Sequence, residues 1–147
     1  MYTVLVPTDG SVHAERALQY CIELAALLRP ALRVELLTVQ LPLAGVNVKL
    51  FIKPQSIEEH YREEGNKLLG GPKQLLEAAG IACEPHIGVG DPATVIVEFS
   101  KSLVVDQIVM GTQGRGALAE AVMGSVARRV VQESSVPVLL IPALRGG

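Results

Sequence analysis

The sequence predicts an α/β protein built on a parallel sheet with helices on both faces. Apolar runs typical of strands alternate with segments whose apolar residues recur every three or four positions. Hydrophobic residues make up 49% of the chain but aromatic residues only 3%, so the core must be built from Val, Ile, Leu and Ala, as in strands buried on both faces. The length of 147 residues suits one domain, which we expect to span residues 1–147.

The chain opens with a predicted strand, helix and strand. Residues 2–7 form an apolar, β-branched run that predicts the first strand, and residues 8–11 supply turn and helix-capping side chains. A helix then extends to about Leu28, because its apolar residues recur at intervals of three and four and give it one buried face. Pro30 ends this helix, and residues 32–39 predict a second buried strand.

The next two segments are less regular. Residues 41–54 are apolar and partly alternating, which is consistent with an extra strand, but we favour a long loop that covers part of the site or a partner. Residues 56–79 carry a helical apolar pattern that is interrupted at residues 70–72, Gly-Gly-Pro. Proline removes a backbone hydrogen bond and clashes with the preceding turn. Because the apolar phase continues beyond it, we expect one kinked helix.

The second half of the chain continues the alternation. Pro85 marks its first strand as an edge strand, because proline has no N–H to donate to a neighbouring strand. Asp91-Pro92 predicts a helix start, with a capping residue followed by proline at the first helical position. In the order strand, helix, strand, helix, strand, we expect these elements at residues 81–89, 91–103, 105–110, 125–133 and 136–141.

Two loops with suitable chemistry leave strands at the edge of the sheet where ligands bind. In open α/β sheets this is the edge formed by the carboxyl ends of the strands, at the point where the strand order reverses. Residues 7–11 follow the first strand, and residues 111–116 follow the fourth. If these two strands are neighbours, the two loops face each other across one cleft.

The glycine-rich loop at residues 111–116 is followed by Gly124-Ser125, where a new helical pattern begins. Glycines let a ligand approach the backbone and leave several N–H groups pointing the same way. A serine at a helix N-terminus adds a hydroxyl and the positive end of the helix dipole. Either fragment alone is also consistent with an ordinary turn or cap, but both fragments at this spacing after a strand predict phosphate binding.

The two loops together resemble the universal stress protein family, and specifically its ATP-binding branch. That branch is marked by Gly-x2-Gly-x9-Gly-Ser/Thr near the fourth strand. The residues that fit this pattern are Gly111, Gly114, Gly124 and Ser125. Further similarity, which extends the resemblance over almost the whole chain, lies at residues 6–11, 90–92, 106–111 and 136–138.

The resemblance implies a doubly wound, open parallel sheet of five strands in the order 3-2-1-4-5. It also implies a homodimer that forms through the fifth strand, from Val136 to Ile141. The ligand that it implies is ATP, together with Mg²⁺. Asp9 would accept a hydrogen bond from the ribose or help to hold the metal, although Asp9 taken alone is also consistent with a helix cap.

The resemblance also assigns the other contacts with the nucleotide. Pro7 and Thr8 would line the nucleoside together with Asp9, and Val39 would meet the adenine through its backbone. Met110 and Gly111 would pass beside the ribose. The phosphates would be contacted by Gly114, Arg115, Gly124, Ser125 and Val126.

The charges of the site agree with this assignment. Arg115 is the only basic side chain inside the glycine motif, whereas ATP carries several negative charges. Backbone N–H groups, the helix dipole at Ser125 and a metal must therefore do most of the neutralising. Arg128 and Arg129 lie on the last predicted helix and are interpreted as a solvated face.

The function that we expect is that of an ATP-binding universal stress protein, a regulatory module of the stress response with little or no turnover. A Walker sequence is absent, so the usual phosphate-binding lysine is missing. The three histidines are scattered, without metal-ligand spacing. A slow Mg²⁺-dependent ATP hydrolase, a dinucleotide-binding fold, and an interaction module that binds AMP or no nucleotide remain as alternatives.

Composition bears on location and partners. The net charge of −2, without a basic tail, makes nucleic acid an unexpected partner. No apolar run approaches membrane-spanning length, and the residues before Thr8 are too few for a signal peptide. Cys21 and Cys83 lie far apart in apolar patterns and are interpreted as reduced packing residues. These features predict a cytoplasmic protein.

Overall fold

The computed structural model describes residues 1–28, 31–43, 54–113 and 123–142. Within them, a sheet of five strands has the order β3-β2-β1-β4-β5, and all four pairs of neighbours are parallel. The predicted α/β fold and its strand order are therefore confirmed. The elements are β1 (Tyr2–Pro7), α1 (Val12–Ala25), β2 (Leu32–Gln40), α3 (Pro54–Ala78), β3 (Ala82–Val89), α4 (Pro92–Ser102), β4 (Gln107–Gly111), α5 (Ser125–Glu133) and β5 (Val138–Ile141).

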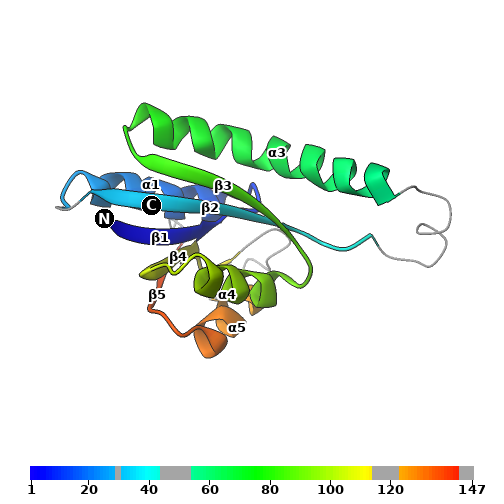
Figure 1. Cartoon of the computed structure of the whole chain (residues 1–147). Coiled ribbons are helices and arrows are strands. Elements are labelled where there is room, and N and C mark those ends of the chain that lie inside the picture. The colour runs from blue at the N-terminus through cyan, green and yellow to red at the C-terminus, as the bar shows by residue number, and fades with distance from the viewer. Residues whose placement is uncertain (29–30, 44–53, 114–122, 143–147) are drawn as a thin grey trace.

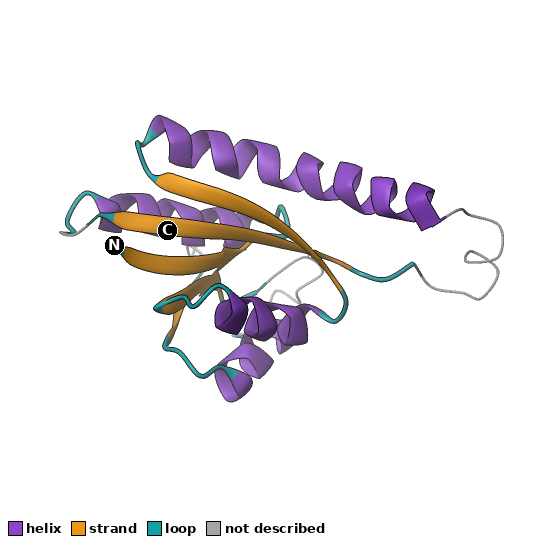
Figure 2. Ribbon diagram, in the orientation of Figure 1, coloured by secondary structure: helices purple, strands orange, loops and turns teal. Residues whose placement is uncertain are grey.

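Helices cover both faces of the sheet. Helices α1 and α3 lie on one face, and α4 and α5 lie on the other (Figures 1 and 2). Successive strand residues point to opposite faces, so each central strand contributes to two separate apolar clusters. Val4 and Val34 pack under α1 and α3, whereas Leu5 and Leu37 pack under α4 and α5. This double burial explains why the strands are continuously apolar.

The helix that contains Gly70, Gly71 and Pro72 is a single one, as expected. Helix α3 runs from Pro54 to Ala78 with Pro72 inside it. Proline disfavours the helical conformation of the residue before it, partly through a clash with that residue's Cβ. Glycine at position 71 has no Cβ and so relieves part of this clash. Residues 44–53, which make up most of the predicted loop at residues 41–54, lie outside the described residues.

Pro85 lies in β3, and β3 is an edge of the sheet, as the missing N–H of proline predicts.

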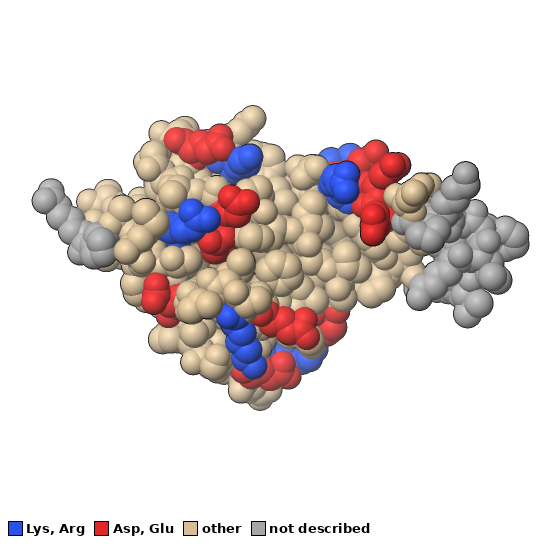
Figure 3. Space-filling view, in the orientation of Figure 1, with Lys and Arg blue, Asp and Glu red and all other residues tan. Residues whose placement is uncertain are grey.

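The side chain of Glu35, on the neighbouring strand β2, is buried and interacts with two basic side chains. Its Oε1 lies 2.8 Å from Arg33 Nε, and its Oε2 lies 2.6 Å from His86 Nε2. On the face drawn in Figure 3, Lys and Arg side chains lie beside Asp and Glu.

The pKa of Glu35 reflects two opposing effects. Burial opposes its ionisation, but the hydrogen bonds from His86 and Arg33 outweigh burial and hold the pKa below its usual value. A carboxyl with a lowered pKa in the folded state stabilises the fold above its unfolded-state pKa. It loses this contribution as the pH falls through the folded-state pKa.

Replacing Glu35 with glutamine is therefore expected to lower the free energy of unfolding at pH 7 by about 1–3 kcal/mol. The difference from the wild type should narrow as the pH falls below the ordinary glutamate pKa of about 4.3. Urea unfolding at pH 7, 5, 4 and 3 measures this directly. Glu84→Gln, at an exposed position of β3, is the matched control and should have little effect. A gap for Glu35→Gln that is independent of pH would contradict the prediction.

Helices α3 and α4 end with the same backbone motif but with different residues. In both, the residue with positive φ and its successor donate N–H groups to carbonyls of the last helical turn, which is the Schellman arrangement. The residue with positive φ is Gly80 after α3, with φ of 72°, and Val104 after α4, with φ of 51°. A β-branched residue is strained in this conformation. The Val104 side chain gains little in return, because the residue is 80% exposed.

Val104→Gly is accordingly expected to raise the free energy of unfolding by about 1 kcal/mol, since it removes the left-handed strain and few contacts. Gly80→Val, at the equivalent position after α3, should lower it by a similar amount. Urea unfolding of both variants against the wild type tests the pair. Unchanged or reduced stability of Val104→Gly would show that Val104 makes a stabilising contact that its exposure does not suggest.

Candidate functional site

A cavity of about 420 Å³ opens at the carboxyl edge of the sheet. This volume lies in the range of small-molecule binding sites. After β1 the chain builds β2 and β3 on one side, and it then returns to build β4 and β5 on the other side of β1. The strand order therefore reverses between β1 and β4, and the loops that follow these two strands frame the cavity, as the position rule for open α/β sheets predicts.

Most of the site residues expected from the sequence come together around this cavity. The nine that line it are Pro7, Thr8, Asp9, Val39, Met110, Gly111, Gly124, Ser125 and Val126. The other two, Gly114 and Arg115, lie outside the described residues. Sequence reasoning missed several further lining residues, among them Leu37, Leu41, Pro92, Ile96, Thr112 and Gln113. Leu37 had a detectable signal, because it lies two residues before Val39 and so shares its face of β2.

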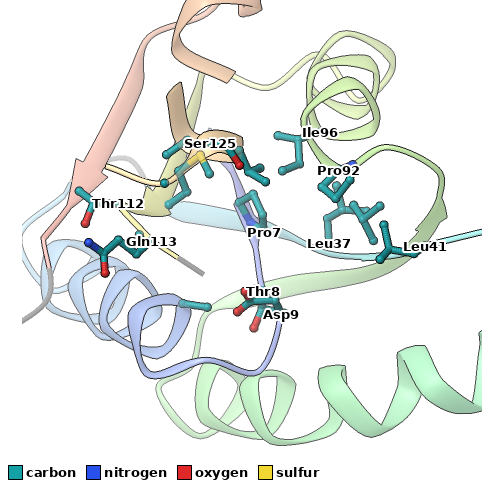
Figure 4. Close-up of a pocket in the computed structure, with 17 residues that line it drawn as sticks. Pro7, Thr8, Asp9, Leu37, Leu41, Pro92, Ile96, Thr112, Gln113 and Ser125 are labelled. Atoms are coloured by element: carbon teal, nitrogen blue, oxygen red, sulfur yellow. The ribbon is translucent and has the colours of Figure 1, made fainter. Parts of the chain in front are cut away.

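The cavity has an apolar side and a polar side. Figure 4 shows the apolar residues Leu37, Leu41, Pro92 and Ile96 grouped on one side of it. Thr112 and Gln113 lie across from them, and Thr8 and Asp9 lie below (Figure 4). A ligand with an apolar ring and a polar or charged tail matches this division.

The loop after β1 is held by a backbone hydrogen bond to β2 and by its own side chains. Thr8 N–H donates to the carbonyl of Leu37 at 2.7 Å, and Ser11 N–H donates to Asp9 Oδ1 at 2.9 Å. Gly10 has φ of 79°, which favours glycine. The N-cap of α1 is Ser11, whose hydroxyl accepts from Ala14 N–H at 3.2 Å. The cap interpretation of Asp9 is thus wrong, and its carboxylate stabilises the turn before the helix instead.

A backbone hydrogen bond joins the start of α5 to the chain directly after β4. Gly124 N–H donates to the carbonyl of Thr112 at 2.6 Å, so residues 112 and 124 are joined directly. The first helical hydrogen bond runs from Arg128 N–H to the carbonyl of Gly124 at 3.1 Å. The N–H groups of residues 125–127 therefore have no acceptor within the helix. Since all three of these residues line the cavity, their N–H groups are its candidate anion donors.

Gly111 is required at the end of β4 because of a close approach to α1. A Cβ at this position would lie 2.7 Å from the carbonyl oxygen of His13 and 2.9 Å from its carbonyl carbon. The first turn of α1 is thereby held against the end of β4. This contact brings the loop after β1 close to the loop after β4.

Comparison with known proteins agrees with the observed fold. The sequence pattern of the Universal stress protein family matches residues 1–142. The chain belongs to the universal stress protein family. Universal stress protein MJ0531 of Methanocaldococcus jannaschii is 31% identical over 138 residues, which cover 94% of this chain and 80% of that protein.

Solved structures of family members show the same fold. The structure of MJ0577, from the same organism, has a TM-score of 0.86 at 30% identity and covers 99% of this chain and 98% of that chain. A universal stress protein in complex with cAMP has a TM-score of 0.70 at 25% identity, covering 95% and 96%. The Archaeoglobus fulgidus universal stress protein in complex with dAMP has a TM-score of 0.62 at 26% identity, also covering 95% and 96%.

In this universal stress protein, the described lining of the cavity has few charges. Asp9 is its only ionisable side chain among the described residues. Helices α1, α4 and α5 all begin at this edge of the sheet, and residues from the first turn of each line the cavity. A helix N-terminus carries a partial positive charge, so these three helix starts favour an anionic ligand.

The fit of a metal at Asp9 follows from the same inventory. Among the described residues, no group of three or more His, Cys, Asp or Glu side chains could hold a metal ion. Mg²⁺ is nevertheless often bound by one or two carboxylates together with the phosphates of a nucleotide. A single carboxylate such as Asp9 therefore fits a metal only if a phosphate ligand supplies further oxygens.

The last feature of the site is the ion pair between α4 and α5. Arg129 Nη1 lies 2.7 Å from Asp91 Oδ2, and Asp91 is the N-cap of α4. Hydrogen bonds from Thr94 and then from Arg129 hold the pKa of Asp91 below its usual value. The expectation that Arg129 belongs to a solvated face is thus incomplete, because this half-exposed side chain joins two helices.

Proposed function

We propose that this protein is an ATP-binding member of its family, a regulatory module of the stress response that holds an adenine nucleotide with little or no turnover. The observation that carries the proposal is the cavity itself. It lies between the loop after β1 and the start of α5, and it combines an apolar side with three N–H groups that have no acceptor within their own helix. Relatives at 25% and 26% identity, with cAMP and dAMP respectively, support an adenine nucleotide as the ligand.

In this proposal the nucleoside occupies the side formed by β1, β2 and α4. Val39 meets the adenine through its backbone, and Pro7 and Thr8 line the nucleoside. Met110 and Gly111 lie beside the ribose. The phosphates extend toward the start of α5, where Ser125 and Val126 contribute N–H groups and Ser125 also contributes a hydroxyl.

The structure refines the role of Gly124 within this proposal. Its N–H already donates to the carbonyl of Thr112 and is not available to the phosphates. Gly124 instead leaves room for them, because it has no side chain. Gly114 and Arg115 complete the phosphate contacts by their place in the motif. Asp9 either accepts from the ribose or helps to hold Mg²⁺.

Calorimetric titration of ATP, AMP and NADH into protein stripped of carried-over ligand tests the proposal, with and without Mg²⁺. We expect binding of ATP and no comparable binding of NADH. Preferential binding of AMP or a cyclic nucleotide would favour a sensor of those ligands. Absence of binding by any adenine nucleotide would overturn the proposal in favour of a protein-interaction module.

Turnover is measured in the same samples as phosphate release. The chain has no Walker lysine, and the described lining of the cavity offers no ionisable group other than Asp9 to activate a water. Bound ATP should therefore survive for many minutes in the presence of Mg²⁺. Release at about one phosphate per second or faster would identify an ATPase.

We also propose a homodimer that forms through β5. This strand pairs with β4 along one edge, and its other edge has no strand beside it within the described chain. Its residues are all apolar, so no charge protects that edge from pairing with another strand. Two-fold pairing of identical edges is the commonest closed arrangement.

Leu140→Asp or Val138→Asp is expected to give monomers by light scattering, because either change places a charge on the pairing edge. Val131→Asp makes a comparable change at a 46%-exposed position of α5 and should leave the dimer intact. Circular dichroism of each variant is the check that it is folded. A wild-type protein that is monomeric at micromolar concentration would overturn the proposed dimer.

The proposed domain spans residues 1–147, and the proposed location is the cytoplasm. Cys21 and Cys83 are both free thiols, which supports a reducing compartment. Burial raises the pKa of Cys21 to about 12, and burial together with nearby carboxylates raises that of Cys83 to about 11. Both thiols are therefore protonated and unreactive at neutral pH. In the described part of the chain, no helix is long and apolar enough to cross a membrane.

A further inference from the structure

Arg129 connects α4 and α5, two neighbouring helices whose first turns both line the cavity. Its Nη1 donates to Asp91 Oδ2 at 2.7 Å, and its Nη2 donates to Thr94 Oγ1 at 3.3 Å. Both acceptors belong to the start of α4, whereas Arg129 lies in α5. The same guanidinium lies 3.6 Å from Glu133 Oε1, one turn later in α5. The guanidinium therefore interacts both with its own helix, α5, and with the start of the neighbouring helix, α4.

The acceptor of this ion pair is the residue that starts α4. Asp91 Oδ2 accepts from Thr94 N–H at 3.1 Å and from Thr94 Oγ1 at 2.8 Å, which is the N-cap arrangement. Pro92 follows directly, and Ile96 lies one turn later; both line the apolar side of the cavity. Any shift of Asp91 therefore moves the apolar wall.

The donor of the ion pair, Arg129, lies close in sequence to the residues of α5 that line the cavity. Residues 124–127 line the cavity, and Arg129 lies two residues after them on the same rigid helix. Asp91 and Arg129 are 38 residues apart in the sequence, so the contact is tertiary. It ties the start of α4 to the helix that carries the candidate anion donors.

This ion pair is expected to contribute little to the stability of the fold. Both side chains are about half exposed, at 42% and 50%, and ion pairs at such positions add little to the free energy of folding. The geometry is more specific than a casual surface pair, because the planar guanidinium binds a carboxylate and a hydroxyl of the same helix cap at once. A contact of this kind defines a relative position of two helices.

We propose that Arg129 is a positioning residue of the nucleotide site. By binding Asp91 and Thr94, it sets the separation between the apolar wall at the start of α4 and the N–H donors at the start of α5. A ligand that spans both parts is bound more tightly when that separation is correct, whereas a ligand that uses one part alone is indifferent to it. The inference rests on the proposed function, because it requires a nucleotide that lies across both helices.

The test compares AMP, which spans both parts, with adenosine, which lacks the phosphate. Arg129→Gln removes the charge and the guanidinium that binds Asp91 and Thr94 at once, and Asp91→Asn removes the charge of the acceptor while keeping a good N-cap. Each variant should bind AMP roughly five-fold more weakly than the wild type, with adenosine affinity unchanged. The double variant should be no weaker than the weaker single variant, because both changes break one contact.

The two single variants also separate positioning from charge. If Arg129 acted by attracting the phosphate, Arg129→Gln would weaken AMP binding, but Asp91→Asn would strengthen it by removing a negative charge. Positioning predicts weaker binding in both. Arg128→Gln removes the same charge from an exposed position of the same helix and should leave AMP binding unchanged.

The outcomes are distinct from a failure of the proposed function. A wild-type protein that binds no adenine nucleotide overturns both proposals at once. Wild-type binding of AMP with unchanged affinity in Arg129→Gln overturns the positioning role alone. Parallel losses of AMP and adenosine affinity would also overturn it, because they indicate general damage to the cavity. Opposite effects of the two single variants would assign Arg129 a direct electrostatic role in place of positioning.

Discussion

Gly111→Ala is expected to lower the free energy of unfolding by about 1–3 kcal/mol and to weaken nucleotide binding. The new Cβ would lie 2.7 Å from the carbonyl oxygen of His13, and this oxygen belongs to the backbone of a capped helix. A flexible side chain could rotate away from such a clash, but the first turn of α1 cannot. Either α1 or the end of β4 must move, and both hold loops that line the cavity.

Gly70→Ala is the matched control for this substitution. Gly70 lies inside α3, and a Cβ there would meet nothing within 4 Å. Because glycine is unfavourable in a helix interior, this change should raise the free energy of unfolding by about 0.5–1 kcal/mol. Urea unfolding and calorimetric titration of both variants measure the effects. If Gly111→Ala were as stable as the wild type, the close contact of β4 with α1 would not exist in solution.

Gly124→Val is expected to abolish ATP binding while the sheet stays folded. Gly124 has φ of −71° and ψ of 162°, a conformation that any residue adopts, so the backbone does not forbid the substitution. The branched side chain would instead occupy space at the start of α5 that the proposed phosphate contacts require. Some helix stability is lost as well, because valine is a poorer N-cap than glycine.

Ser125→Ala should be milder than Gly124→Val, because it removes one hydroxyl and leaves the backbone donors and the dipole. A hydrogen bond to a charged group contributes about 1.5–3 kcal/mol, so a loss of roughly ten-fold to a hundred-fold in ATP affinity is expected. Asp9→Asn should weaken Mg-ATP more than AMP if Asp9 acts through the metal, and both alike if it acts through the ribose.

Calorimetry on these variants, with circular dichroism as a check of folding, tests the site directly. ATP binding by Gly124→Val at wild-type affinity would mean that the glycine segment only turns the chain. The proposed phosphate contacts at the start of α5 would then be wrong. The proposed nucleoside contacts in β1 and β2 would need independent support.

The elements themselves were predictable because their signals are local. The β-branched run at residues 2–7 and the Asp91-Pro92 helix start each depend on a few neighbouring residues, and the structure has a strand and a helix there. Pro85 correctly predicted an edge strand, because proline has no N–H to donate to a neighbouring strand in any fold. Element ends were less accurate. Helix α1 ends at Ala25, ahead of the predicted Leu28, and β5 begins at Val138, after the predicted Val136.

Part of the site was also determined by the sequence. Both loops were predicted to follow strands, and nine of the residues assigned through the family resemblance line one cavity. The strand order came from that resemblance and not from the residue pattern. Local periodicity states that strands and helices alternate, but it does not state which strands are neighbours.

Only the tertiary structure decided the contacts between distant segments. Gly111 needs to be glycine because of the carbonyl of His13, and Arg129 binds the cap of a helix 38 residues away. Pro92 and Ile96 line the cavity because α4 packs beside α5 on one face of the sheet and begins at the carboxyl edge of the strands. The physical reason is the same in each case. Turn chemistry and periodicity act over a few residues, whereas close approach, burial and ion pairing depend on how the helices lie on the sheet.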